Sequence, residues 1–207
     1  KCSGRSLAPR MSQPERILGI DPGTVVMGFG VIERVGSELR LIDLGSVKFA
    51  ASKESVERLG DILASVEELL DRFQPTSLAV EAPFFGKNVQ SMLKLGRAQG
   101  VVLSAGLRRG LTVAEYPPAV VKRRISGRGA ASKEQLAGFL EAMYTIPIDP
   151  KRALDATDAL AVATCHALTV QRTATLSAAG ALPAKKKSSA RASSWAKFLA
   201  QNPDREA

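Results

Sequence analysis

The order of apolar patterns between residues 16 and 170 constrains the fold of this chain more than any other feature. Short apolar or alternating runs predict strands, and apolar residues spaced three or four apart predict helices. The expected strands cover 17–20, 25–35, 38–49, 78–80 and 111–115. The expected helices cover 54–73, 88–109, 119–124, 132–143 and 152–170. Three successive strands followed by alternating helices and strands predict an α/β fold, a mixed sheet with helices on both faces.

Two local signals support these boundaries. Gly36-Ser37 separates the second and third expected strands, and such a pair between two strand-like runs indicates a hairpin. Ser132 directly precedes the expected helix 132–143, where a serine oxygen can accept a hydrogen bond from a free backbone N–H group of the first turn. We therefore predict a tight turn at the first position and a helix N-cap at the second.

Length and composition indicate one folded domain with terminal extensions. The 207 residues are 45% hydrophobic, enough for a sizeable core. We expect a disordered leader at 1–13, a folded domain at 14–171 and a basic flexible tail at 172–207. No apolar run reaches the roughly 18–20 residues of a membrane helix, and the N-terminus does not resemble a secretory signal. Reading Cys2 and Cys165 as reduced thiols, we expect a cytoplasmic protein.

Positive charge is concentrated inside the expected domain. The net charge is +9, and residues 87–133 contain ten basic residues and one acidic residue, Glu115. A basic segment flanked by acidic ones predicts a surface for a polyanion beside an acidic site, although a merely solvated basic face is the simpler alternative. Within this segment the candidate phosphate contacts are Arg123, Arg124 and Arg128.

Four acidic residues are candidates for one site. Asp21 and Glu81 each follow a short apolar strand, and ligands of α/β sheets collect where strands end. Asp155 and Asp158 are three apart near the start of an apolar helix, so they share one face of it. Each acid alone has an ordinary interpretation as a turn, surface or helix-start residue. Their joint placement predicts a cluster of carboxylates.

The expected cluster favours a hard divalent cation. Four neighbouring carboxylates repel one another, and two Mg²⁺ ions would neutralise them. The chain has one histidine, His166, so a histidine-rich zinc site is excluded. Paired metal ions can activate a water molecule and stabilise a departing oxygen in phosphodiester cleavage. We expect two Mg²⁺ ions per site, with Mn²⁺ as the alternative, and a metal-dependent DNA endonuclease.

The ordered motifs of residues 16–170 resemble those of the RuvC-type Holliday-junction resolvases, which have a ribonuclease H-like fold. The resemblance rests on these segments: Leu18-Gly19-Ile20-Asp21-Pro22-Gly23-Thr24, Val80-Glu81 with Phe84 and Lys87-Asn88, Leu93-Lys94-Leu95-Gly96, Glu115-Tyr116 with Val121-Lys122, Gly127-Arg128-Gly129 with Lys133-Glu134-Gln135, and Asp155-Ala156-Thr157-Asp158-Ala159-Leu160-Ala161. The first segment alone is a weak signal, whereas the ordered set at these spacings is specific.

This resemblance implies a homodimer that cuts opposed strands of four-way DNA junctions in recombination and repair, working with a branch-migration complex of the RuvA and RuvB type. The family's four acids fall on Asp21, Glu81, Asp155 and Asp158. Its basic residues near the scissile phosphate fall on Lys122 and Lys133, and its aromatic residue near the junction centre falls on Phe84. Lys87 and Asn88 are further candidate DNA contacts. Some relatives have histidine where this chain has Asp155.

Two other functions agree with parts of the sequence. A strand followed by Asp-x-Gly-Thr also resembles the phosphate loop of the actin and sugar-kinase folds, in which Gly23 and Thr24 would contact ATP. That architecture needs two such domains, and the expected core supplies one. A ribonuclease H-like module could also bind junctions without cutting them, which the four acids argue against.

Overall fold

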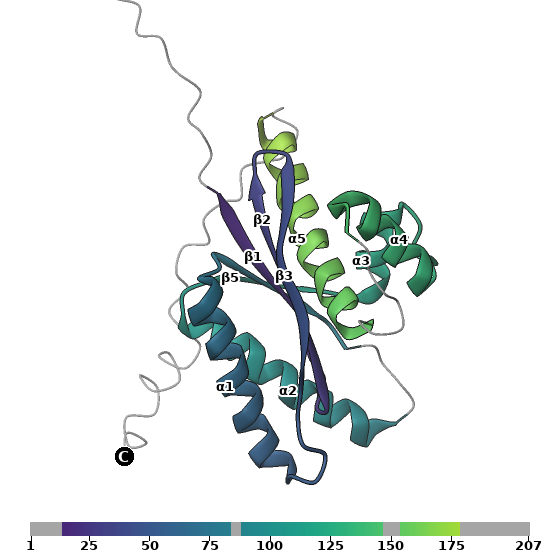
Figure 1. The fold of residues 1–207 in the computed structure, drawn as a ribbon. Helices are drawn as coiled ribbons and strands as arrows, with labels where there is room; N and C mark the ends of the chain where they lie inside the picture. The colour runs from purple at the N-terminus through teal and green to yellow at the C-terminus, as the bar shows by residue number, and fades with distance from the viewer. Residues whose placement is uncertain (1–13, 84–87, 147–153, 179–207) are drawn as a thin grey trace, which may run out of the picture. The chain divides into compact units, whose positions relative to one another are not determined.

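The computed structural model describes residues 14–83, 88–146 and 154–178 (Figure 1). The strands are β1 Glu15–Asp21, β2 Val26–Val35, β3 Glu38–Lys48, β4 Ser77–Glu81 and β5 Thr112–Tyr116. The helices are α1 Ser55–Phe73, α2 Val89–Arg108, α3 Pro118–Ser126, α4 Lys133–Tyr144 and α5 Leu154–Ala178. The chain divides into two compact units, Lys1–Arg172 and Thr173–Ala207, and the sheet lies in the first. All ten expected elements are therefore present in the expected order.

The five strands form one mixed sheet in the order β3-β2-β1-β4-β5. The pairs β1–β2 and β2–β3 are antiparallel, whereas β1–β4 and β4–β5 are parallel. Gly36, with φ of 63°, lies in the tight turn that joins β2 to β3. Glycine tolerates this left-handed backbone at little cost, which confirms the predicted hairpin.

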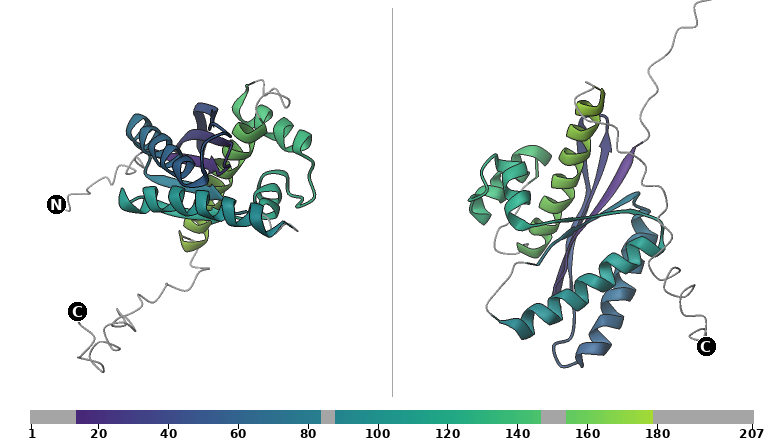
Figure 2. Two further views of the ribbon diagram at one scale, coloured as in Figure 1. Left: turned by 90° about the horizontal axis from the view of Figure 1, so that it is seen from below. Right: turned by 180° about the vertical axis from the view of Figure 1, so that it is seen from behind.

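Each face of the sheet has its own apolar core, because successive side chains of a strand point to opposite faces. Leu18 and Ile20 of β1 join Leu78 and Val80 of β4 in the cluster formed with α1 and α2. Ile17 and Ala79 point the other way and belong to the cluster formed with α3, α4 and α5. Figures 1 and 2 show these two groups of helices on opposite sides of the sheet. The predicted α/β architecture with helices on both faces is confirmed.

Glycines on β1 and β2 allow α5 to lie close against the sheet. A Cβ atom at Gly28 would lie 1.9 Å from the carbonyl oxygen of Asp155. A Cβ atom at Gly19 would lie 2.2 Å from the carbonyl oxygen of Ala159. Such distances are far below van der Waals contact, so any larger residue would push the helix away. The first turns of α5 thereby reach the end of the sheet where β1 and β4 finish.

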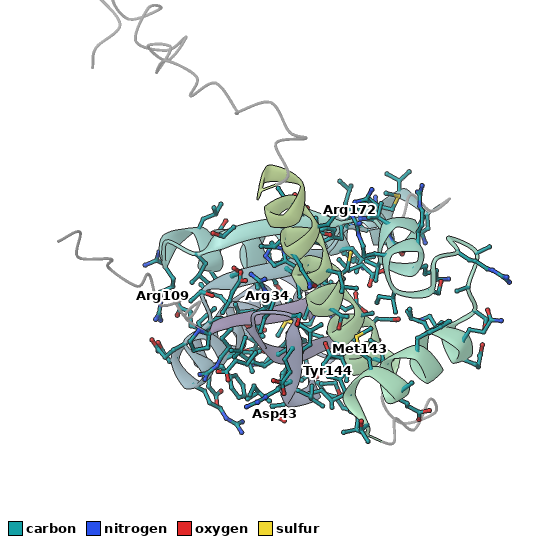
Figure 3. All side chains as sticks on the ribbon, turned by 90° about the horizontal axis from the view of Figure 1, so that it is seen from above. Arg34, Asp43, Arg109, Met143, Tyr144 and Arg172 are labelled. Atoms are coloured by element: carbon teal, nitrogen blue, oxygen red, sulfur yellow. The ribbon has the colours of Figure 1, made fainter. Side chains whose placement is uncertain are left out.

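The observed helix ends lie close to those predicted from the sequence, except at the C-terminal end of α5. The Ser132 hydroxyl accepts a hydrogen bond from the N–H of Gln135 at 3.2 Å, so the predicted N-cap is confirmed. Tyr144, at the end of α4, places its hydroxyl 2.8 Å from the Thr164 hydroxyl of α5 (Figure 3). Helix α5 ends at Ala178, beyond the predicted Val170, because residues 171–178 contain neither glycine nor proline. The rest of the predicted tail, and the leader 1–13, lie outside the described residues.

Candidate active site

Asp21 and Glu81 stand side by side where two parallel strands end. Ile20 of β1 pairs with Val80 of β4, so the next residue of each strand, an acid in both cases, lies beside the other. Strand alternation turns both side chains to the face on which Gly19 and Ala79 meet α5. Both acids are only partly exposed. The predicted proximity of these two carboxylates follows directly from the strand register.

Helix α5 adds the other two acids. Asp155, in its first turn, lines a cavity of about 290 Å³ together with Asp21 and Glu81. The cavity wall is completed by Pro22, Gly23, Val26, Ala82, Pro83, Leu95, Gln99 and Pro118. Asp158 is one turn further along the helix and accepts a hydrogen bond from Lys133 at 2.6 Å. The structure thus brings all four predicted acids to one end of the sheet.

Burial and mutual repulsion disfavour the ionised form of the carboxyl groups in this cavity. The pKa of Glu81 is raised from its ordinary 4.5 to about 8, first by burial and then by the charges of Asp21 and Asp158. The pKa of Asp21 is raised from 3.8 to about 6, again mainly by burial, with Asp158 and Asp155 adding repulsion. A cation bound between these two carboxylates would therefore stabilise their ionised forms strongly.

Two lysines oppose this repulsion. Lys133, the first residue of α4, and Lys122 of α3 both act to lower the pKa of Glu81. The hydrogen bond to Asp158 is the main reason why the pKa of Lys133 itself is raised. Both lysines predicted to lie near the reacting phosphate are therefore close enough to the acids to influence their charge.

The donor set matches a hard divalent cation in its chemistry. Asp21, Glu81 and Asp155 bring only carboxylate oxygens to the cavity, and these are the ligands that Mg²⁺ and Mn²⁺ prefer. In the described ranges no three Asp, Glu, His or Cys side chains already stand in a metal-binding arrangement. The fourth acid, Asp158, is instead paired with the ammonium group of Lys133 at 2.6 Å.

The predicted arginine contacts lie outside the acidic cavity. Arg123 and Arg124 line a second cavity on α3, and Arg128 lines a third, beside α4. Asn88 is the N-cap of α2, where its side-chain oxygen accepts a hydrogen bond from the N–H of Ser91 at 3.1 Å. Phe84 and Lys87 fall outside the described residues. DNA contact by each of these residues stays a prediction.

Sequence reasoning missed two features of the site. Gln99 of α2 is 8% exposed, lines the acidic cavity and donates a hydrogen bond from its Nε2 to the Glu115 carboxylate of β5. The available signal was Gln99 itself, a polar residue among the apolar residues of the predicted helix, because a buried amide needs a hydrogen-bond partner. Gly28 was also missed, because the need for glycine there depends on α5, which is distant in sequence.

A mixed sheet of this strand order, with acids at the ends of two adjacent strands and on the last helix, defines a protein of the ribonuclease H-like class. The family profile described as "Crossover junction endodeoxyribonuclease RuvC" matches residues 17–166. This chain belongs to the RuvC family, as its motifs predicted.

Curated relatives and solved structures agree with this assignment. The RuvC of Porphyromonas gingivalis is 43% identical over 197 residues, covering 94% of this chain and 99% of the relative. The RuvC of Bacteroides fragilis is 42% identical over 199 residues, with the same coverage of 94% and 99%. The structure described as "T. thermophilus RuvC in complex with Holliday junction substrate" superposes with a TM-score of 0.72 at 36% identity, covering 77% of this chain and 96% of that one.

Proposed function

We propose that this chain cleaves opposed strands of four-way DNA junctions by two-metal phosphodiester hydrolysis. The observation that carries the proposal is the cavity shared by Asp21, Glu81 and Asp155, with Lys133 and Asp158 paired beside it. The chain also belongs to a family of crossover junction endodeoxyribonucleases. Recombination and DNA repair are the processes in which such an activity would act.

The acids would bind the metal ions, and the lysines would contact the DNA. Asp21, Glu81, Asp155 and Asp158 would hold two Mg²⁺ or Mn²⁺ ions, which when bound would activate a water molecule and stabilise the departing oxygen. Glu81, with a pKa of about 8, holds a proton near neutral pH and must release it when it becomes a ligand. Lys133 would then leave Asp158 and donate to the scissile phosphate, with Lys122 beside it.

The DNA would be held mainly through its backbone. Lys122, Arg123, Arg124, Arg128 and Lys133 all come from α3, α4 or the loop between them, which forms one continuous basic stretch of the chain. Contacts to phosphates fix the position of DNA without reading its sequence, as an enzyme selective for branched structure requires. Phe84 would stack on bases at the junction centre, with Lys87 and Asn88 near the backbone.

A second copy of the chain would supply the second cut. Val89 and Leu93 of α2 are 66% and 54% exposed, and they line a largely apolar cavity with Gly96. Large exposed apolar side chains gathered on one helix suit a protein interface. We propose a homodimer that works with a RuvA and RuvB type branch-migration complex in the cytoplasm. Within the described ranges, no helix is long and apolar enough to cross a membrane.

Cleavage of a synthetic four-way junction tests the proposal. The protein is incubated with the junction, or with a linear duplex of the same sequence, while Mg²⁺ and Mn²⁺ are titrated separately. We expect paired nicks in opposed strands of the junction, dependent on metal, and no cleavage of the duplex. Junction binding without cleavage in either metal would favour a non-catalytic module. Saturable ATP binding without junction binding would favour a phosphotransferase.

A further inference from the structure

A cavity of about 500 Å³, distinct from the acidic one, is lined by Val120, Arg123 and Arg124 of α3 and by Arg172 of α5. Arg172 is labelled in Figure 3 beside the α5 ribbon. Arg123 and Arg172 are exposed, and Arg124 is half-buried. Three guanidinium groups from two helices thus surround one hollow.

These three arginines differ from most others in the protein because they lack carboxylate partners. Ion pairs with Asp or Glu are formed by Arg16, Arg34, Arg40, Arg72, Arg108 and Arg109. Across the part of the chain that the structure describes, Arg123, Arg124 and Arg172 form no such pair. Three uncompensated positive charges around a hollow repel one another, and an anion placed between them would relieve that repulsion.

Arg124 is partly buried against the rest of the protein. Its positive charge lies close enough to the fully buried thiol of Cys165 in α5 to act on the pKa of that thiol. The Tyr116 hydroxyl lies 2.9 Å from Nδ1 of His166. Burial raises the pKa of this hydroxyl, and the nearby charge of Arg124 opposes that rise. A half-buried side chain of this kind has less freedom to lose on binding an anion than a fully exposed one, which favours binding.

We propose that this cavity binds a backbone phosphate of a junction arm, and this inference rests on the proposed function. Planar guanidinium groups bind phosphate oxygens in bidentate pairs. The cavity and the acids are linked through α3, since Arg123 directly follows Lys122, whose charge acts on Glu81.

The helix geometry sets the distance between the two sites. Arg172 follows Asp155 by 17 residues of α5, which at roughly 1.5 Å per residue corresponds to about 25 Å. At roughly 3.4 Å per nucleotide step, that span equals about seven base pairs of an arm. The cavity would therefore contact long arms and miss short ones.

Junctions with different arm lengths test this assignment in EDTA, where no cleavage occurs. We compare arms of about 15 and about 5 base pairs for the wild type and for Arg172→Ala. The wild type should bind long arms about fivefold more tightly, whereas the variant, which keeps Arg123 and Arg124, should show a clearly smaller preference, with a salt slope about one unit smaller on long arms. Arg40→Ala, which removes the same charge from an exposed pair on β3, should behave as the wild type.

Two results would overturn the assignment. One is an Arg172→Ala variant that keeps the full preference for long arms while folding normally by circular dichroism. The other is calorimetric binding of inorganic phosphate that requires Arg172, combined with a wild type indifferent to arm length, since the cavity would then serve a free anion. Failure of the wild type to select junctions over duplex would instead refute the proposed function, so the two failures are distinguishable.

Discussion

The ammonium group of Lys133 lies 2.6 Å from the Oδ2 atom of Asp158, joining the first residue of α4 to the helix that carries two of the four acids. The Asp158 side chain is 18% exposed and the lysine side chain 53%. The pair therefore neutralises one acid at the edge of the cavity while the lysine stays accessible to solvent. An exposed positive charge at this place is suited to bind either the aspartate or a phosphate.

Replacing this lysine separates a catalytic role from a general contribution of charge. Lys133→Ala should lower the single-turnover cleavage rate about 10²–10³-fold, because the charge that develops at the phosphate loses its stabilising donor. Junction binding should fall much less. Lys53→Ala removes a lysine that is also paired with an aspartate, Asp61 at 2.8 Å, and should cleave at the wild-type rate. Equal losses of rate in both variants would contradict the role assigned to Lys133.

The raised pKa values predict how stability depends on pH in the metal-free protein. Glu81, with a pKa of about 8, and Asp21, with a pKa of about 6, keep protons in the folded state that the unfolded chain releases near their ordinary values of 4.5 and 3.8. The folded state therefore binds more protons between these values. The contribution of these two groups to stability should be fully present below their ordinary values and should be lost as pH rises towards 8.

The Glu81→Gln variant measures this effect directly. In EDTA at about pH 8.5, it should raise the free energy of unfolding by about 1–3 kcal/mol, because it removes the cost of ionising a buried carboxyl, with little change at about pH 4.5. Glu38→Gln is the control, since the pKa of the exposed Glu38 is lowered by its hydrogen bond with Arg40. Denaturant titration at both pH values gives the comparison, and a pH-independent effect of Glu81→Gln would count against buried ionisation.

The close approach of α5 predicts a large effect at one glycine. Gly28→Ala should destabilise the protein by about 1–3 kcal/mol, because the added Cβ meets the Asp155 carbonyl oxygen. It should also reduce cleavage strongly by moving Asp155. Gly60→Ala, in an open position of α1, should stabilise by about 0.5–1 kcal/mol without changing cleavage. Thermal unfolding and cleavage assays on both variants test this, and wild-type cleavage by Gly28→Ala would refute the positioning argument.

The apolar surface of α2 predicts the oligomeric state. Leu93→Glu should shift the protein from dimer to monomer in sedimentation experiments, because it places a charge in the proposed interface. Val56→Glu changes another strongly exposed apolar residue, 72% exposed on α1, and should leave the dimer intact. A Leu93→Glu variant that remains dimeric would place the interface elsewhere.

Much of the fold follows from local patterns. The strands and helices have strong periodicity, and the parallel pairing of β1 with β4 brings Asp21 and Glu81 together once both are recognised as strand-end acids. Residues Asp155 and Asp158 were placed correctly on α5 because their spacing of three residues fits one helix face. Such features depend on neighbours in sequence or on the general order of an α/β sheet.

Other features depend on contacts that no local pattern contains. Gly28 needs to be glycine only because α5 crosses β2 at that point. The pairing of Lys133 with Asp158 depends on where α4 packs, and the hydrogen bond from Gln99 to Glu115 depends on how α2 lies against β5. Arg172 belonged to the predicted tail, yet it lies within α5 and faces a cavity shared with α3.

The most direct test of the central claim compares four conservative variants in one experiment. Junction binding in EDTA and junction cleavage in Mg²⁺ are measured for the wild type and for Asp21→Asn, Glu81→Gln, Asp155→Asn and Asp158→Asn. We predict that every variant binds the junction at least as tightly as the wild type, because the acids repel phosphate, and that none cleaves it appreciably. Wild-type cleavage by Asp21→Asn would contradict a carboxylate-centred metal site.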